Sequence, residues 1–209
     1  MAGGVAVLLA LCVQAEDRKW YARLDAGGTL LNNTDVEEFI GPASGTMKFD
    51  AGYSFGIAGG YHVTPWLAVE LQTGYTINGV DGLDAVLTQM PFTANIVYEC
   101  KYCGKFVPFL GVGVGGVTSI FTVDDWVNVG EGTVDLEGSD GDIVFAYQAF
   151  GGFRYEFNDR MSVGFLYRFR GTGAPSWDVE DDYTGNTIGQ ISLDNIYTHT
   201  FSVLFNMKF

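Results

Sequence analysis

No apolar stretch in this 209-residue chain reaches the roughly 18 to 20 residues that a membrane-spanning helix requires. The one apolar block, residues 2–13, is short and lies at the N-terminus. It runs into Val13-Gln14-Ala15 and then the charged pair Glu16-Asp17, which is the order of features in a secretory signal peptide and its cleavage site. The sequence therefore predicts a cleaved signal peptide over residues 1–15 and an exported domain over residues 16–209.

Histidine and basic residues are also scarce. The chain has 2 His and 11 Lys+Arg against 25 Asp+Glu, for a formal net charge of −14. So few cations argue against nucleic-acid binding, which needs basic patches. One histidine, His62, lies beside a short turn and the other, His199, on the apolar face of a strand-like run, so the pair does not support a Ser-His-Asp triad. We therefore expect no enzymatic activity, no catalytic residues and no cofactor.

Only two cysteines, Cys100 and Cys103, lie in the predicted exported domain. An even number of cysteines in an exported chain is compatible with one disulfide. A Cys-x-x-Cys pair is also found in redox and metal sites, but a zinc site needs about four ligands and the chain offers no second pair. We expect a disulfide across a tight turn and no metal site there.

What the sequence does contain is alternation of apolar and polar residues, most clearly near the C-terminus. The odd positions from Tyr197 to Phe209 are mainly apolar, whereas most even positions are polar. A period of two over about a dozen residues predicts a strand with one apolar and one polar face. Eight such runs occur, at residues 20–30, 49–62, 66–76, 88–100, 106–117, 145–157, 161–170 and 197–209. Each is about as long as a tilted membrane strand, which has about 9–11 residues.

The connections between these runs alternate in length. Three are short, at residues 63–65, 99–105 and 158–160, and four are long, at residues 32–48, 77–86, 118–142 and 171–194. Short turns at one rim and long loops at the other are typical of transmembrane barrels. The sequence therefore predicts an all-β fold, an eight-stranded antiparallel up-and-down transmembrane β-barrel.

The acidic residues gather in the long connections. These hold 17 of the 25 Asp+Glu and one base, Lys48, so they sum to −16 and the rest of the chain to +2. This distribution predicts acidic loops facing outward above a nearly neutral barrel. Acid clusters at residues 124–125, 135–142 and 178–182 offer oxygen ligands to divalent cations, but their spacing differs from that of an EF-hand, and a solvated acidic surface is the expected alternative.

Charged and amide side chains recur on the polar, inward faces of the runs. Because a barrel of eight strands is just wide enough to be filled by side chains, and buried charges must be paired, we expect these groups to plug the interior. The predicted interior polar network comprises Arg23, Asp25, Glu70, Gln72, Gln148, Arg154 and Arg168, and the inward faces also carry Asp50, Glu156 and Arg170. We expect Glu70 to pair with Arg23, Arg154 or Arg168 at the centre. A narrow channel for small solutes or ions is the alternative.

Three segments, residues 89–98, 108–116 and 146–153, resemble the eight-stranded outer-membrane barrel family that includes OmpA-like transmembrane domains and opacity-type surface proteins. The C-terminal strand is similar to that family's insertion signal, carried here by Phe205, Met207 and Phe209. It departs from the pattern at Leu204, where Gly is usual, and at Met207, where an aromatic residue is usual.

The resemblance implies a monomer in the outer membrane of a Gram-negative bacterium, in contact with lipid and lipopolysaccharide and assembled by the barrel-insertion machinery. It also implies a structural or surface-interaction role, with an extracellular ligand of unknown identity bound through the loops. A minor alternative within the same architecture is an outer-membrane enzyme of the lipid A deacylase kind.

Overall fold

A computed structural model describes residues 19–32, 34–38, 45–81, 85–100, 104–123, 126–129, 132–135, 141–174, 176–180, 187–193 and 195–209. The predicted signal peptide and Cys103 lie outside these residues, so neither is tested. In the described part, no helix is long and apolar enough to cross a membrane.

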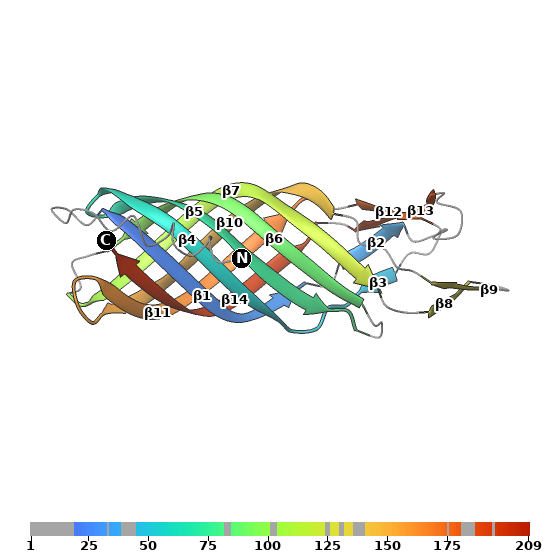
Figure 1. Ribbon diagram of the computed structural model, residues 1–209, viewed down its shortest axis with the longest axis horizontal. Helices are drawn as coiled ribbons and strands as arrows, with labels where there is room; N and C mark the ends of the chain where they lie inside the picture. The colour runs from blue at the N-terminus through green and yellow to red at the C-terminus, as the bar shows by residue number, and fades with distance from the viewer. Residues whose placement is uncertain are drawn as a thin grey trace, which may run out of the picture.

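Eight antiparallel strands close into a barrel, in which each strand pairs with its neighbours in chain order and the last pairs with the first (Figure 1). They are β1 (Trp20–Leu31), β4 (Gly52–Thr64), β5 (Leu67–Gly79), β6 (Ala85–Glu99), β7 (Phe106–Val123), β10 (Gly141–Glu156), β11 (Met161–Thr172) and β14 (Tyr197–Lys208). The predicted fold class is confirmed. Closure leaves no free strand edge, which is what lets a sheet cross a membrane.

The alternation in sequence becomes alternation of burial. Along β4, for example, inward residues are buried and outward ones exposed at almost every step. The exposed residues are largely aromatic and aliphatic, as a lipid-facing surface requires. Aromatic pairs lie at the ends of β1, β4, β5 and β6 beside the short turns: the ring centroids of Trp20 and Tyr61 are 4.9 Å apart, and those of Trp66 and Tyr98 are 6.0 Å apart. These rings form part of an interfacial girdle.

The short connections and the C-terminus lie at one end of the barrel (Figure 1). There the backbone N–H of Phe209 donates to the carbonyl oxygen of Trp20 at 2.8 Å, and that of Lys208 donates to Arg160 at 2.7 Å. These bonds tie the end of β14 to its neighbours on both sides, so the last strand does not fray.

The opposite end carries strands that the sequence did not predict. β2 (Thr34–Glu38), β3 (Gly45–Met47), β12 (Ser176–Glu180) and β13 (Thr187–Leu193) form a second sheet in the order β12-β13-β2-β3, and β8 (Trp126–Val129) pairs with β9 (Gly132–Asp135). In Figure 1 these elements lie beyond the barrel, on the side away from the short turns. β7 and β10 also pair past their predicted bounds, as far as Ile120 and Gly141. Beyond the membrane a strand needs no apolar face, so backbone pairing continues where the alternation that predicts it ends.

The loop-side interior includes apolar side chains at positions where the sequence predicted polar ones. Six inward side chains here are buried and small or aliphatic, and we call them the apolar cap: Leu31, Leu87, Val117, Val144, Ala146 and Ile196. Three of them, Val117, Val144 and Ala146, form one packed cluster. Buried polar side chains lie at the same end of the interior, among them Thr29, Asn78, Ser119 and Thr172, so the cap is one part of a mixed interior.

Candidate functional site: the barrel interior

The middle of the interior holds a cluster of ion pairs around Glu70. Arg23 Nη2 donates to Glu70 Oε1 at 2.9 Å, Asn95 Nδ2 donates to the same oxygen at 3.1 Å, and the Tyr21 hydroxyl donates to Oε2 at 3.0 Å. The Arg23 guanidinium also lies 5.2 Å from the centroid of the Phe150 ring, a cation–π distance. Glu70 is only 2% exposed, so these donors replace the water it has lost.

The cluster extends from Arg23 to a second carboxylate. Asp25 Oδ1 lies 3.7 Å from Arg23 Nε and accepts from Arg168 Nη2 at 3.0 Å. Arg23, Asp25, Glu70 and Arg168 thus form a chain of alternating charge, which we call the central cluster. Its four residues come from β1, β5 and β11, so it crosses the lumen and joins opposite walls.

Amide side chains complete the central cluster on the β5, β6 and β10 side. The Gln72 amide lies between Gln148 and Arg168, with one terminal atom 2.9 Å from Gln148 Nε2 and the other 2.8 Å from Arg168 Nη2. Gln148 Nε2 donates to Asn95 Oδ1 at 2.7 Å and to Thr93 Oγ1 at 2.9 Å. The arrangement is a dense, buried network, as a plug requires.

A second set of charges lies near the short-turn rim, and we call it the rim cluster: His62, Glu99, Arg154, Glu156 and Lys208. Arg154 donates to both oxygens of Glu99, at 2.7 and 2.6 Å, in a bidentate pair. His62 Nε2 lies 3.1 Å from Glu99 Oε2, and Lys208 Nζ donates to Glu156 Oε1 at 2.6 Å. The two pairs lie side by side, with Arg154 Nη2 3.8 Å from Glu156.

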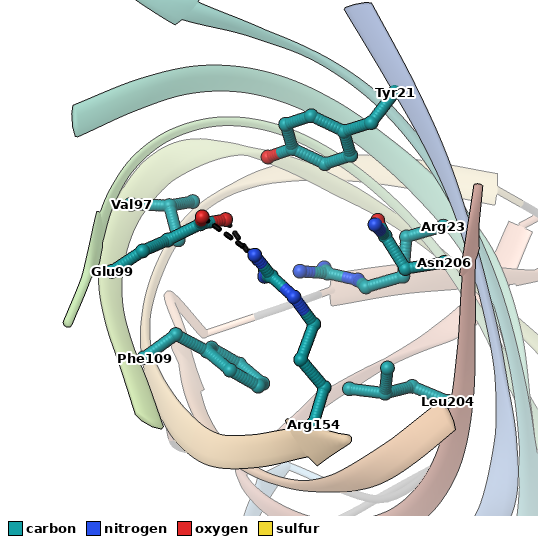
Figure 2. Close-up of a pocket in the computed structure, with 8 residues that line it drawn as sticks. All are labelled: Tyr21, Arg23, Val97, Glu99, Phe109, Arg154, Leu204 and Asn206. Atoms are coloured by element: carbon teal, nitrogen blue, oxygen red, sulfur yellow. Dashed lines mark hydrogen bonds and ion pairs between the residues drawn. The ribbon is translucent and has the colours of Figure 1, made fainter. Parts of the chain in front are cut away.

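A small cavity separates the two clusters. Figure 2 shows Arg154 extending across the lumen to Glu99, while Arg23 points into the same space from the other side. The space open to the centre of a water molecule is about 10 Å³, room for about one water. The lining residues are Tyr21, Arg23, Val97, Glu99, Phe109, Arg154, Leu204 and Asn206.

Inward glycines make room for the large side chains of the interior. A Cβ on Gly60 would overlap the ring of Tyr21, which passes over that residue on its way to Glu70. A Cβ on Gly111 would likewise overlap the Phe150 ring. The space that these glycines leave is therefore filled by aromatic side chains, which closes the lumen further.

The structure brings the seven predicted network residues together in these two clusters: six lie in or against the central cluster, and Arg154 lies in the rim cluster. Asp50, which the sequence also placed on an inward face, does not belong to either cluster. It is exposed and precedes β4, because the second predicted strand begins three residues later than expected, at Gly52. Glu99 was missed as a site residue because it lay where the predicted strand 88–100 overlaps the predicted connection 99–105. Continuing the inward series Asn95, Val97, Glu99 by one step would have found it.

The remaining predicted residues lie outside this network. Phe205 and Phe209 are exposed and Met207 is half-buried at the outer end of β14. Cys100 is a half-buried free thiol next to residues that are not described, so the disulfide with Cys103 stays a prediction. His199 lies on the outer face, where its Nδ1 is 2.8 Å from the Tyr167 hydroxyl.

Comparison with known proteins agrees with this architecture. A model of the outer membrane protein beta-barrel domain matches residues 3–209. The chain belongs to this family. Membership of the outer membrane beta-barrel family implies the outer membrane of a Gram-negative bacterium as its location, as the resemblance predicted. No curated protein sequence matched the chain.

Solved structures of outer membrane barrels share the fold at low sequence identity. Neisserial surface protein A (NspA) is 16% identical, with a TM-score of 0.59 over 91% of this chain and 97% of NspA. OprG from Pseudomonas aeruginosa is also 16% identical, with a TM-score of 0.60 over 91% and 96%. The outer membrane protease OmpT from Escherichia coli is 7% identical, with a TM-score of 0.55 over 91% and 97%. At these identities the likeness shows the fold alone.

Proposed function

We propose that this protein is a closed outer-membrane barrel whose role is structural and surface-directed: the interior is plugged, and the loop end is presented to partners outside the cell. The observation that carries the proposal is the bidentate Arg154–Glu99 pair, with distances of 2.7 and 2.6 Å, below a cavity that holds about one water. A hydrated ion needs a continuous wider path than this.

Three successive layers support a closed interior. The rim cluster lies at the short-turn end, the central cluster crosses the middle, and the apolar cap lies on the loop side among buried polar side chains such as Asn78 and Ser119. The rim cluster rests on a bidentate ion pair, the central cluster on a chain of ion pairs supported by amides, and the apolar cap on aliphatic packing. These three interactions are lost under different conditions. Opening one layer would leave the other two in place.

The loop end supports the surface role. The strands outside the barrel form a four-stranded sheet and a hairpin, so the long connections carry regular structure. Binding commonly resides in loops that a rigid scaffold positions. The net charge of −16 on these connections favours cationic partners and divalent ions over anionic ones.

The proposal does not include catalysis. His62 lies in the buried rim cluster on Glu99, and His199 pairs with Tyr167 on the lipid-facing side, so the two bases are on opposite sides of the barrel wall. Neither adjoins a Ser, Thr or Cys side chain in the described interactions, and none of the described His, Cys, Asp and Glu residues form a group of three that could hold a metal ion.

Single-channel recording in a planar bilayer tests the closed interior. We expect no discrete conductance steps from the folded, inserted barrel, with insertion verified separately by protease protection. Reproducible steps would overturn the plug and make the protein a narrow porin. The variant Arg154→Ala/Glu99→Ala should remain silent too, because the central cluster and the apolar cap stay in place.

Cysteine labelling on intact cells tests the orientation. In a background with Cys100 and Cys103 replaced by Ser, Asn128→Cys in β8 should react with a membrane-impermeant maleimide. Asn158→Cys in the short turn 157–160 is the matched control and should react only after the outer membrane is opened. The reverse pattern would place the loops on the periplasmic side and remove the surface role.

A further inference from the structure

Among the described residues, Arg170 is a buried cation of the interior that has no counter-ion. Arg170, on β11, is 2% exposed and points into the lumen one inward position nearer the loops than Arg168. Its Nε and Nη1 atoms have no hydrogen-bond partner. Among the ion pairs of the described residues, none within 4.0 Å involves Arg170.

The two carboxylates of the central cluster are already engaged. Asp25 is bonded to Arg168 at 3.0 Å, and Glu70 to Arg23 at 2.9 Å. Counting Arg170 with the four residues of the central cluster gives three cations against two carboxylates, a net charge of +1. Adjacent inward positions on one strand are about 7 Å apart, so the positive charge of Arg168 repels that of Arg170.

The surroundings of Arg170 exclude bulk water. Its direct cross-strand partners are Thr198 on β14 and Gln148 on β10. The next inward pair toward the loops is Thr172 and Ala146, and Ala146 belongs to the apolar cap. An unpaired charge in such a place is strongly unfavourable.

A second unsatisfied donor lies at the same level. The Thr198 hydroxyl donates to Gln89 Oε1 at 3.4 Å across the lumen, which brings the Gln89 amide alongside the position that pairs with Arg170. The other amide atom, Gln89 Nε2, is buried and has no partner. Gln148 Oε1 is an unpartnered acceptor nearby, but a neutral oxygen does not compensate the charge.

We propose that the loop-side interior of this barrel binds a small inorganic anion, such as chloride, between Arg170 and Gln89 beneath the apolar cap. The anion accepts from Arg170 Nε or Nη1 and from Gln89 Nε2, which satisfies the orphan donors and brings the local charge to zero. A small monovalent anion fits the net charge of +1, whereas a larger organic anion would have to displace the cap.

The halide dependence of stability tests this site. The folded barrel in lipid vesicles is unfolded with urea at constant ionic strength, in sodium chloride, sodium bromide or sodium gluconate, whose anion is too large for the interior. If the halide is present at about ten times its Kd, the folding equilibrium constant should rise about elevenfold over that in gluconate. Arg170→Met should abolish this rise. Arg160→Met, in the exposed short turn, changes the charge equally and should retain it.

Crystals of the unsubstituted protein grown in bromide give a test that needs no variant. We expect an anomalous bromide peak within hydrogen-bonding distance of Arg170. A water or a loop carboxylate in that position would overturn the proposal. So would an unsubstituted barrel whose stability is the same in halide and gluconate, or an Arg170→Met variant that responds like the unsubstituted protein.

Discussion

Arg23 and Glu70 meet in the lumen at 2.9 Å although their strands are not neighbours. β4 lies between β1 and β5, and the residues of β4 at this level, Ala58 and Gly60, have side chains too small to intervene. The ion pair therefore links two strands that share no backbone hydrogen bonds. Within the lumen it acts as a side-chain cross-link between β1 and β5.

We expect this pair to contribute strongly coupled stability. Arg23→Met or Glu70→Leu alone should lower the free energy of unfolding by about 3–5 kcal/mol, because each leaves a buried charge unpaired. The double variant should recover much of that loss, since both charges are then absent. Urea unfolding in lipid vesicles measures the free energy of unfolding of the unsubstituted protein, of each single variant and of the double variant. An interaction energy near zero would mean that Glu70 is held by Tyr21 and Asn95 and not by Arg23.

Gly60 and Gly59 provide a second, steric test on adjacent residues. Gly60→Ala puts a methyl group into the Tyr21 ring, so we expect a loss of about 1–3 kcal/mol from overpacking. Gly59 points outward with nothing within 4 Å of an added Cβ, so Gly59→Ala should have no adverse effect. The same unfolding measurement compares the two. Equal losses would show that glycine is needed here for the backbone and not for the space above it.

The barrel itself could be predicted because membrane strands are constrained on both faces. Lipid demands apolar side chains outside and the filled lumen demands polar or small ones inside, so every strand carries a period of two. Within the membrane this fixes which face each residue occupies, and Arg23, Asp25, Glu70 and Arg168 all point inward as predicted. The choice of Arg23 as the partner of Glu70 was one of three that the sequence left open.

The rest could not be predicted because the constraint ends at the membrane surface. The sheet β12-β13-β2-β3 has no lipid-facing side, so its segments show no clear alternation. The apolar cap lies on inward faces where the pattern expects polar residues. Glu99 lay where the predicted strand 88–100 overlaps the predicted connection 99–105, and the position of Arg154 across the lumen is what gives it a charged partner.

Glu99 and Glu156 should respond differently to loss of charge. Glu99 is 1% exposed and accepts from Arg154 and His62, so Glu99→Gln should lower the free energy of unfolding by about 3–5 kcal/mol. The Glu156 side chain is 24% exposed, so Glu156→Gln should lower it by about 0–1 kcal/mol although its pair with Lys208 is as short. Unfolding of both variants in parallel is the measurement. A larger effect at Glu156 would mean that the Glu156–Lys208 pair at the rim surface stabilises the barrel more than the buried Glu99–Arg154 pair does.

On the outer face of the barrel, we expect the hydrogen bond between Tyr167 and His199 to stabilise the folded protein. The two side chains lie 2.8 Å apart among the aromatic rings of Phe169 and Phe201, with little water to replace a lost partner. Tyr167→Phe should lower the free energy of unfolding by about 0.6–2 kcal/mol, because His199 Nδ1 then loses its hydrogen-bond partner on the outer face. Tyr167→Phe/His199→Phe removes both polar groups and should restore stability. Tyr155→Phe, outward beside the short-turn rim, is the control and should cost less, because its hydroxyl is near water. If Tyr167→Phe and Tyr155→Phe lose the same amount, the hydrogen bond to His199 does not stabilise the barrel.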